Sequence, residues 1–360
     1  MDSGAHEPDS PYWLAATRAE AELILGDVDR ARGLLEEAVS DQPRAWEDHA
    51  ITLRQFALLL SETGEDSDWL DTLRPPPVLY FGGIMGLAPG DSGAEAEIAE
   101  ALARIAPGCG YGALAAGTDI LCAEGLSRRQ ADVNLVLPAD REEFFRRSVE
   151  PAGQDWSDRF AREYERAASV RVVPEADAVD SCSIEMAASL AMGLALSRAD
   201  QLQTRAVALW VREPAAEASS MQAWSLWREK GHEVVEVFCE RTAERRDLRR
   251  ERAVQTVCVS LASGEEGLRG FADVPAALSE ARKLDRCVLD FAAVREGNEP
   301  ADVAESALRS APPNGIFATE AAMAVARLHA PDLSSELAGA VRTVAGEVDL
   351  YRLWFGQAAV

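Results

Sequence analysis

Residues 108–138 read GCGYGALAAGTDILCAEGLSRRQADVNLVLP. The glycine-rich GYGALAAG (110–117) is typical of a short strand or turn, a helix is predicted to open at Thr118, and DVNLVLP predicts an apolar strand that ends in Pro138. A strand, a helix and a strand in this order form half of a doubly wound nucleotide-binding unit. A helix N-terminus beside small residues leaves backbone N–H groups free to meet an anion, so we expect a ligand near this helix start.

The same alternation continues on both sides of this stretch. VLYFGG (78–83) predicts a buried strand that ends in two glycines, and further strands are predicted at 169–173, 205–211 and 232–238, with helical segments between them. This spacing predicts an α/β fold with a central, doubly wound parallel Rossmann-like sheet and helices on both faces. In such sheets, ligands bind beyond the carboxyl ends of the strands, where the strand order reverses.

The candidate ligand-binding residues follow the ends of three predicted strands. They are Gly82, Gly83, Gly112, Gly117, Thr118, Asp119 and Pro138. Alternative roles stay open, because Gly82 and Gly83 also suit a tight turn and Thr118 or Asp119 also suits a helix N-cap without any ligand. Glu124 either faces the cleft or pairs with Arg128 four residues later, and the pairing is the favoured interpretation. No catalytic residue is assigned.

A helical region precedes the α/β pattern. Residues 12–64 have helical periodicity without strand signals, and GDVDRARGLLEEAVSDQP (26–43) resembles the second helix of a tetratricopeptide repeat. The run Pro75-Pro76-Pro77 predicts a boundary. We therefore divide the chain into a repeat-like helical region at 1–74, the α/β domain at 75–243 and a small α+β domain at 244–360. The basic stretch RRDLRRER (245–252) is interpreted as a solvated connector.

Composition narrows the classes of partner and cofactor. The chain has 36 Lys and Arg against 61 Asp and Glu, a net charge of −25. Such a chain repels nucleic acid and anionic membranes at long range, so we expect neither as a partner. No run of 18 apolar residues is present and the first ten residues are polar and acidic, which predicts a cytoplasmic protein. The six cysteines form no CxxC pair and the four histidines are scattered, so neither a metal nor another cofactor is expected.

The segment GALAAGTDILCAEGLSRRQADVNLVLP resembles the SLOG superfamily of Rossmann-like nucleotide-sensing domains. In that family a small-residue loop and a G-x-D-(I/L) helix start precede a strand that ends in Leu-Pro. Residues 12–240 also resemble a bacterial signalling architecture in which tetratricopeptide-type repeats, akin to the TRAFs-binding region of stress-kinase regulators, precede such a domain. The resemblance implies a nucleotide-like ligand. The family commonly has a His and an Asp just after the first strand, where this chain has Gly83 and Gly86, and this departure argues against hydrolytic chemistry at that loop.

The C-terminal segment resembles half of a class III nucleotidyl cyclase catalytic domain, on PPNGIFATEAAMAVA and the closing EVDLYRL. That family needs two metal-binding aspartates, and the opening strand VCVSLASGEEG here contains none. Asp273 is interpreted as the N-cap of the next helix, and Glu265 and Glu266 supply at most one metal ligand. The resemblance therefore implies a degenerate unit without catalysis, of a kind that pairs as a homodimer.

Together these observations favour a cytoplasmic signalling sensor or regulator. Its α/β cleft is expected to bind a nucleotide-like small molecule, and a protein partner is expected to bind the helical region or the C-terminal unit. Whether the chain is an enzyme stays open, with a non-catalytic role favoured. The alternatives are a hydrolase that cleaves nucleotide N-glycosidic bonds with Asp119 or Glu124 activating water, a cyclase relative with residual activity, and an interaction scaffold with an empty cleft.

Overall fold

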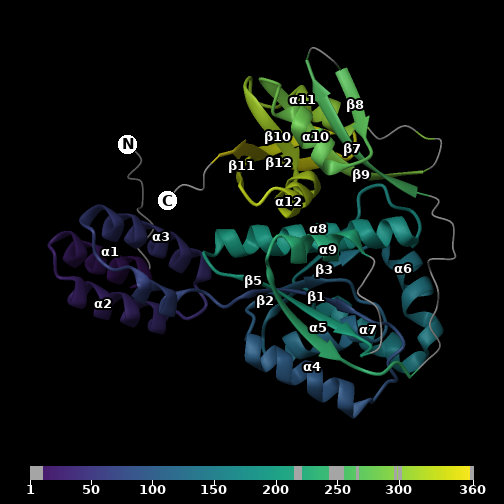
Figure 1. The fold of residues 1–360 in the computed structure, drawn as a ribbon, viewed down its shortest axis with the longest axis horizontal. Helices are drawn as coiled ribbons and strands as arrows, with labels where there is room; N and C mark the ends of the chain where they lie inside the picture. Colours follow the sequence, from purple (N-terminus) through teal and green to yellow (C-terminus); the bar gives the residue numbers. More distant parts are fainter. Residues whose placement is uncertain are drawn as a thin grey trace, which may run out of the picture. The chain divides into compact units, whose positions relative to one another are not determined.

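The computed structural model describes residues 11–214, 221–242, 255–264, 267–295, 298 and 302–356. The predicted connector 245–252 and the pair Glu265 and Glu266 lie outside the described residues. The chain forms two compact units, the first with Met1–Pro76 and Arg198–Arg205 and the second with Pro77–Ser197 and Ala206–Ala359. Figure 1 shows both units and labels most of their helices and strands.

The first unit is helical, as its periodicity predicts. Its elements are α1 (Pro11–Ile24), α2 (Val28–Asp41), α3 (Trp46–Thr63) and the 3₁₀ helix η1 (Asp68–Leu73). The Asp27 side chain caps α2 by accepting from the Arg30 N–H at 3.1 Å. Gly64 ends α3 in the left-handed region at φ +72°, which glycine adopts without a steric cost. The helix η1 was not predicted, because six residues are too few to establish a helical period.

The second unit begins with a sheet of six parallel strands in the order β4-β3-β2-β1-β5-β6. The strands are β1 (Val78–Gly83), β2 (Cys109–Gly112), β3 (Asp132–Leu137), β4 (Ser169–Val172), β5 (Ala206–Arg212) and β6 (Glu233–Phe238). The strand order reverses at β1, since β2, β3 and β4 extend to one side of it and β5 and β6 to the other. The predicted α/β fold with a Rossmann-like parallel sheet is therefore confirmed.

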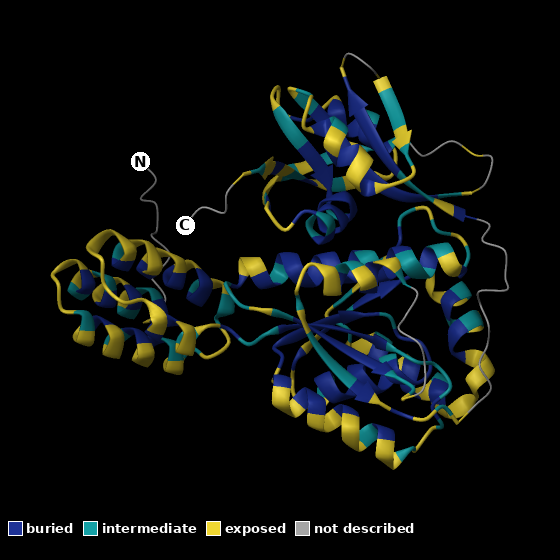
Figure 2. Cartoon of the chain, viewed as in Figure 1, coloured by how far each residue is buried: buried dark blue, intermediate teal, exposed yellow. Residues whose placement is uncertain are grey.

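Helices cover both faces of this sheet. They are α4 (Ser92–Ile105), α5 (Thr118–Arg128), α6 (Arg141–Ser148), the short 3₁₀ helix η2 (Glu150–Ala152), α7 (Gln154–Arg166), α8 (Ser181–Gln201) and α9 (Gln222–Glu229). Val78, Leu79, Tyr80 and Phe81 are all buried, which a strand at the centre of a sheet covered on both faces requires. Figure 2 shows the central strands as the most deeply buried part of this sheet, with exposed residues on the outer faces of the helices. The carboxyl ends of β1, β2 and β3 thus meet at one edge, beneath loops and helix ends.

The C-terminal part of the second unit contains a mixed sheet in the order β11-β12-β10-β9-β7-β8. Its elements are β7 (Gln255–Ser263), β8 (Gly267–Phe271), α10 (Val274–Ala281), β9 (Arg286–Arg295), α11 (Val303–Leu308), β10 (Gly315–Thr319), α12 (Glu320–His329), β11 (Leu333–Thr343) and β12 (Gly346–Phe355). Asp273 caps α10 by accepting from the Ala276 N–H at 2.8 Å, as predicted. The elements β8 and α11 were missed, because GLRGF is short and glycine-rich and α11 has only six residues.

Among the described residues, no helix has the length and apolar character needed to cross a bilayer.

Candidate functional site at the reversal of the strand order

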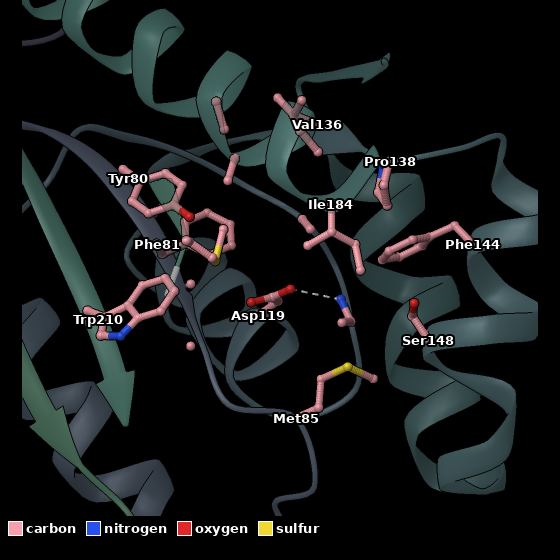
Figure 3. Close-up of a pocket in the computed structure, with 18 residues that line it drawn as sticks. Tyr80, Phe81, Met85, Asp119, Val136, Pro138, Phe144, Ser148, Ile184 and Trp210 are labelled. Carbon is pink, nitrogen blue, oxygen red and sulfur yellow. Dashed lines mark hydrogen bonds between the residues drawn. The ribbon is translucent and has the colours of Figure 1, made fainter. Parts of the chain in front are cut away.

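A cavity of about 130 Å³ lies at the carboxyl ends of the parallel strands, where the strand order reverses. This is the place at which open α/β sheets bind ligands. The sheet, α5, α6, α8 and the loops after β2, β3 and before α9 all contribute to its lining. The lining residues are Tyr80, Phe81, Gly82, Gly83, Met85, Ala113, Ala115, Asp119, Val136, Pro138, Phe144, Ser148, Ile184, Ala187, Ala188, Ala191, Trp210 and Met221. Figure 3 shows these side chains, with Asp119 between the aromatic group at Tyr80 and Trp210 and the apolar group at Ile184 and Phe144.

The end of β1 brings aromatic side chains to the cavity because Gly82 leaves room for them. A Cβ atom on Gly82 would lie 3.0 Å from the Tyr80 hydroxyl and 3.1 Å from the Trp210 ring. A Cβ atom on Gly83 would lie 2.3 Å from the Val211 carbonyl oxygen, so that the close approach of β1 to β5 also depends on glycine. Trp210 stacks on Trp224 with 4.6 Å between the ring centroids. This contact fixes the Trp210 ring at the edge of the cavity.

Asp119 is the carboxyl side chain among the lining residues of the cavity. It lies in the first turn of α5, and its Oδ2 accepts a hydrogen bond from the Ala115 N–H at 3.1 Å. No basic side chain in the described part of the chain forms an ion pair with it. Burial raises the pKa of Asp119 to about 7, and the Ala115 hydrogen bond opposes this shift only in part. The predicted alternative, an N-cap role for Thr118 or Asp119, is corrected: Gly117 occupies the N-cap position at φ +109°, and no side chain caps this helix.

Several backbone N–H groups at the start of α5 and in the loop before it already have partners. The Ala115 N–H donates to Asp119, the Ala116 N–H donates to the Ser148 carbonyl at 3.0 Å, and the Thr118 N–H donates to the Ile84 carbonyl at 3.3 Å. The Thr118 hydroxyl donates to the same Ile84 carbonyl at 2.9 Å. These bonds fasten the loop after β2 to the loop after β1. They also leave fewer free donors for an anion than the sequence pattern suggested.

The structure brings four of the seven predicted site residues to the cavity wall: Gly82, Gly83, Asp119 and Pro138. The other three do not line it. Gly112 packs on Phe81, since an added Cβ would lie 2.5 Å from that ring, and Gly117 lies against the Ile84 carbonyl at 3.0 Å from an added Cβ. Thr118 is directed to the Ile84 carbonyl.

The sequence analysis did not identify most of the apolar residues that line the cavity. Tyr80 and Trp210 lie in strands whose apolar runs predict burial without distinguishing a cavity from a core. Ile184, Ala187, Ala188 and Ala191 occur on α8 at spacings of three and four, the signal of a single helix face. The spacing in the sequence indicates this helix face, but it does not indicate that the face lines a cavity at the end of the sheet.

Glu124 lies outside the cavity, in a buried ion cluster. Arg159 on α7 donates to it from Nε at 2.8 Å and from NH2 at 2.5 Å. The predicted pair with Arg128 is present at 3.7 Å, but it is secondary, since Arg159 is closer and makes two hydrogen bonds. The hydrogen bonds that Arg159 donates to Glu124 raise the pKa of Arg159. The sequence could not identify this partner, because Arg159 lies 35 residues away on another helix.

The described residues contain no group of three or more His, Cys, Asp or Glu side chains placed to hold a metal ion. The cavity therefore offers one carboxyl group, one phenol, the Ser148 hydroxyl and otherwise mainly apolar walls to a ligand. A carboxyl group with a pKa about 7 can accept or donate a proton near neutral pH.

No protein-family model and no curated protein matches the chain. Among solved structures it is similar to the DNA processing protein A (DprA) from Streptococcus pneumoniae, at 12% identity and a TM-score of 0.20, over 44% of this chain and 58% of that chain. The match thus spans less than two thirds of that chain. The repeat, SLOG and cyclase resemblances receive no support from these comparisons.

One expectation needs correction at this point. The acidic composition led us to expect no nucleic-acid partner, but the matching structure is a DNA processing protein, and the expectation is contradicted. A net charge describes the long-range field of the whole chain and does not exclude a local binding surface. A TM-score this low carries no argument for a shared activity, so no DNA-related function follows either.

Proposed function

We propose that this protein is a signalling sensor or regulator whose α/β unit binds a nucleotide-like small molecule in the cavity beside Asp119. In this proposal the C-terminal mixed sheet has no catalytic role and responds to the ligand state of the cavity. The observation that carries the proposal is that helix α8 contacts both the cavity and the C-terminal elements.

One face of α8 lines the cavity through Ile184, Ala187, Ala188 and Ala191. Its other face packs against α12: a Cβ atom on Gly193 would lie 1.9 Å from the Ala324 carbonyl oxygen, and the Ser197 hydroxyl lies 3.5 Å from the Met323 sulfur. Figure 1 shows α8 between the parallel sheet and α12. A ligand that favours one position of α8 therefore also favours one arrangement of α12, which is the requirement for a sensor.

A second candidate function is hydrolysis of a nucleotide-like substrate, and one observation favours it. The pKa of Asp119, about 7, suits a carboxyl group that takes a proton from water. Glu124, the other carboxyl group proposed from the sequence, is not available for this role because it is bound to Arg159. The hydrolase would therefore depend on Asp119 alone.

Thermal unfolding with a panel of nucleosides and nucleoside monophosphates tests ligand binding. A ligand at about 100 times its Kd stabilises the native state by about 2.7 kcal/mol, which gives a measurable rise in Tm. Release of free base or ribose during the incubation would instead support the hydrolase. No rise in Tm for any compound at millimolar concentration would overturn the proposal and favour a scaffold with an empty cleft.

Hydrogen exchange of α12, measured with and without a binding compound, tests transmission through α8. We expect the compound to change exchange in α12 of the wild type but not of Gly193→Ala, in which the α8–α12 contact cannot close. Gly33→Ala on α2 is the matched control, since no atom lies within 4 Å of an added Cβ there. If α12 responds equally in Gly193→Ala while that variant still binds the compound, α8 is not the transmitting element.

A further inference from the structure

The proposed function leaves open which part of a nucleotide-like ligand enters the cavity. The size of the cavity, about 130 Å³, limits the choice. An apolar cavity of about 150 Å³ in another protein accommodates benzene. The space beside Asp119 is therefore suited to a single ring system and not to a whole nucleotide.

The charges around the cavity disfavour an anionic group. Asp119 lines it, and Glu185 on α8 lies close enough to Tyr80 to raise the pKa of that phenol. Arg241 reaches the cavity loop, but its NH1 donates to the Met85 carbonyl at 2.7 Å and its Nε lies 3.3 Å from Glu213. With the Ala115, Ala116 and Thr118 amides already bonded, a phosphate inside would meet a carboxyl group without a dedicated cation.

Two polar side chains beside the Trp210 ring, Tyr80 and Asp119, are open to a ligand, and the Ser148 hydroxyl also lines the cavity. The Tyr80 side chain is 4% exposed, and its hydroxyl has no hydrogen-bond partner among the described residues. Asp119 has one partner, the Ala115 N–H on Oδ2, so Oδ1 is available. Burial, followed by the charges of Asp119 and Glu185, raises the pKa of Tyr80, which therefore keeps its proton and can donate. A ligand in the cavity that accepts from this hydroxyl would supply the partner that the described residues do not.

The remaining walls suit the faces of a flat ring. Trp210 and Phe81 come from the sheet, and Ile184 and Ala188 from α8. Aromatic and aliphatic walls of this kind stack on planar rings by dispersion and do not select a base by hydrogen bonds. Selection among bases then depends on the polar side chains that line the cavity, which are Asp119, Tyr80 and Ser148.

We propose that this cavity binds a neutral, planar nitrogen heterocycle of the nucleobase class, with a ring N–H donated to Asp119 and a ring acceptor facing the Tyr80 hydroxyl, while the phosphate of a nucleotide stays outside. This inference rests on the proposed function and specifies the part of the ligand that the site recognises. Asp119 and Tyr80 are the specificity-determining residues in this arrangement.

Isothermal titration with separate halves of a nucleotide tests the inference. The probes are adenine, cytosine and uracil as free bases, ribose 5-phosphate and inorganic phosphate as the anionic half, and toluene as a ring of similar size without N–H groups. We expect at least one free base to bind and both phosphate probes to show no binding in the same concentration range.

Single substitutions then measure the separate contributions of Asp119 and Tyr80 to base binding. Asp119→Asn keeps the shape of the side chain and should weaken base binding about tenfold or more while leaving toluene binding unchanged, because only the base loses a hydrogen bond. Tyr80→Phe should weaken base binding by about threefold to tenfold. Asp273→Asn is the matched carboxyl-to-amide control, since Asp273 caps α10 and Asn caps a helix equally well. It should leave all affinities unchanged.

Two results would overturn the inference while the proposed function stands. One is a nucleotide that binds while every free base fails to bind. The other is ribose 5-phosphate binding that Asp119→Asn alters. Failure of bases, nucleosides and nucleotides alike would overturn the proposed function itself.

Discussion

The first turn of α5 and the middle of the same helix place two carboxyl groups five residues apart in opposite surroundings. Glu124 is held by Arg159 through two hydrogen bonds, with Arg128 and Arg162 at 3.7 Å. Asp119 has only a backbone N–H and faces a cavity. The same class of side chain is therefore structural at one position and available to a ligand at the other.

Glu124 and Asp119 differ because burying a charge without a partner costs free energy. A guanidinium partner offsets the cost of burying a carboxylate, and the pair joins two elements of the fold. A buried carboxyl group without such a partner is shifted toward its neutral form, which is the environment that perturbs pKa values at functional sites. Four changes on or against α5 test this distinction.

The largest effect is expected from Arg159→Met, which leaves the buried Glu124 without its main partner. The free energy of unfolding should fall by about 3 kcal/mol, because the exposed Arg128 and Arg162 are too distant to replace two hydrogen bonds. Urea denaturation measures this change. A loss below about 1 kcal/mol would show that Glu124 does not depend on Arg159.

Asp119→Asn should instead raise the free energy of unfolding, and the size of the increase should depend on pH. Because the folded-state pKa is raised from 3.8 to about 7, the native state binds more protons than the unfolded chain between these values, and the wild type loses stability as pH rises through them. Asn at this position does not titrate, so the stability of the variant does not have this pH dependence. It should exceed the wild type by on the order of 2 kcal/mol at pH 8 and lose that advantage below pH 4.

Thermal unfolding at a series of pH values compares the two proteins. Equal stability of Asp119→Asn and wild type at pH 8 would show that the Asp119 pKa is not raised, and would remove the contrast with Glu124.

Thr118→Val tests the loop that positions Asp119. The substitution keeps the shape of the side chain and removes the hydroxyl that donates to the Ile84 carbonyl at 2.9 Å. We expect a loss of about 1 kcal/mol in unfolding free energy, since the Thr118 N–H still donates to the same carbonyl. Base affinity should fall less than in Asp119→Asn, and a larger fall would assign ligand contact to Thr118.

The smallest effect is expected from Arg128→Ala, which removes the pair that the sequence predicted for Glu124. The Arg128 side chain is 61% exposed and lies 3.7 Å from Glu124. Solvent screens such a pair, so chemical denaturation should register a change of about 0.3 kcal/mol. A loss as large as that of Arg159→Met would reverse our ranking of the two arginines.

The sequence predicted the elements of the α/β part closely. The apolar strand at 78–83, the helix start at Thr118 and the strand that ends before Pro138 all occur, because local patterns of this kind arise from burial on a repeating geometry. The short elements β8 and α11 were missed, since a few residues carry too little periodicity. The expectation of free amides at the start of α5 was weakened by contacts with Ile84 and Ser148, which come from other parts of the chain.

The sequence by itself determined the alternation of strands and helices, the buried character of β1 and the presence of small residues and an acid at the start of α5. Only the tertiary structure decided that Glu124 meets Arg159, that Tyr80 and Trp210 form a wall beside Asp119, and that α8 contacts both the cavity and α12. Hydrophobic period and turn chemistry are local properties, so one segment is enough to reveal them. The surroundings of a charge depend on residues far away in the chain, and those surroundings separate a structural carboxyl group from one that a ligand can reach.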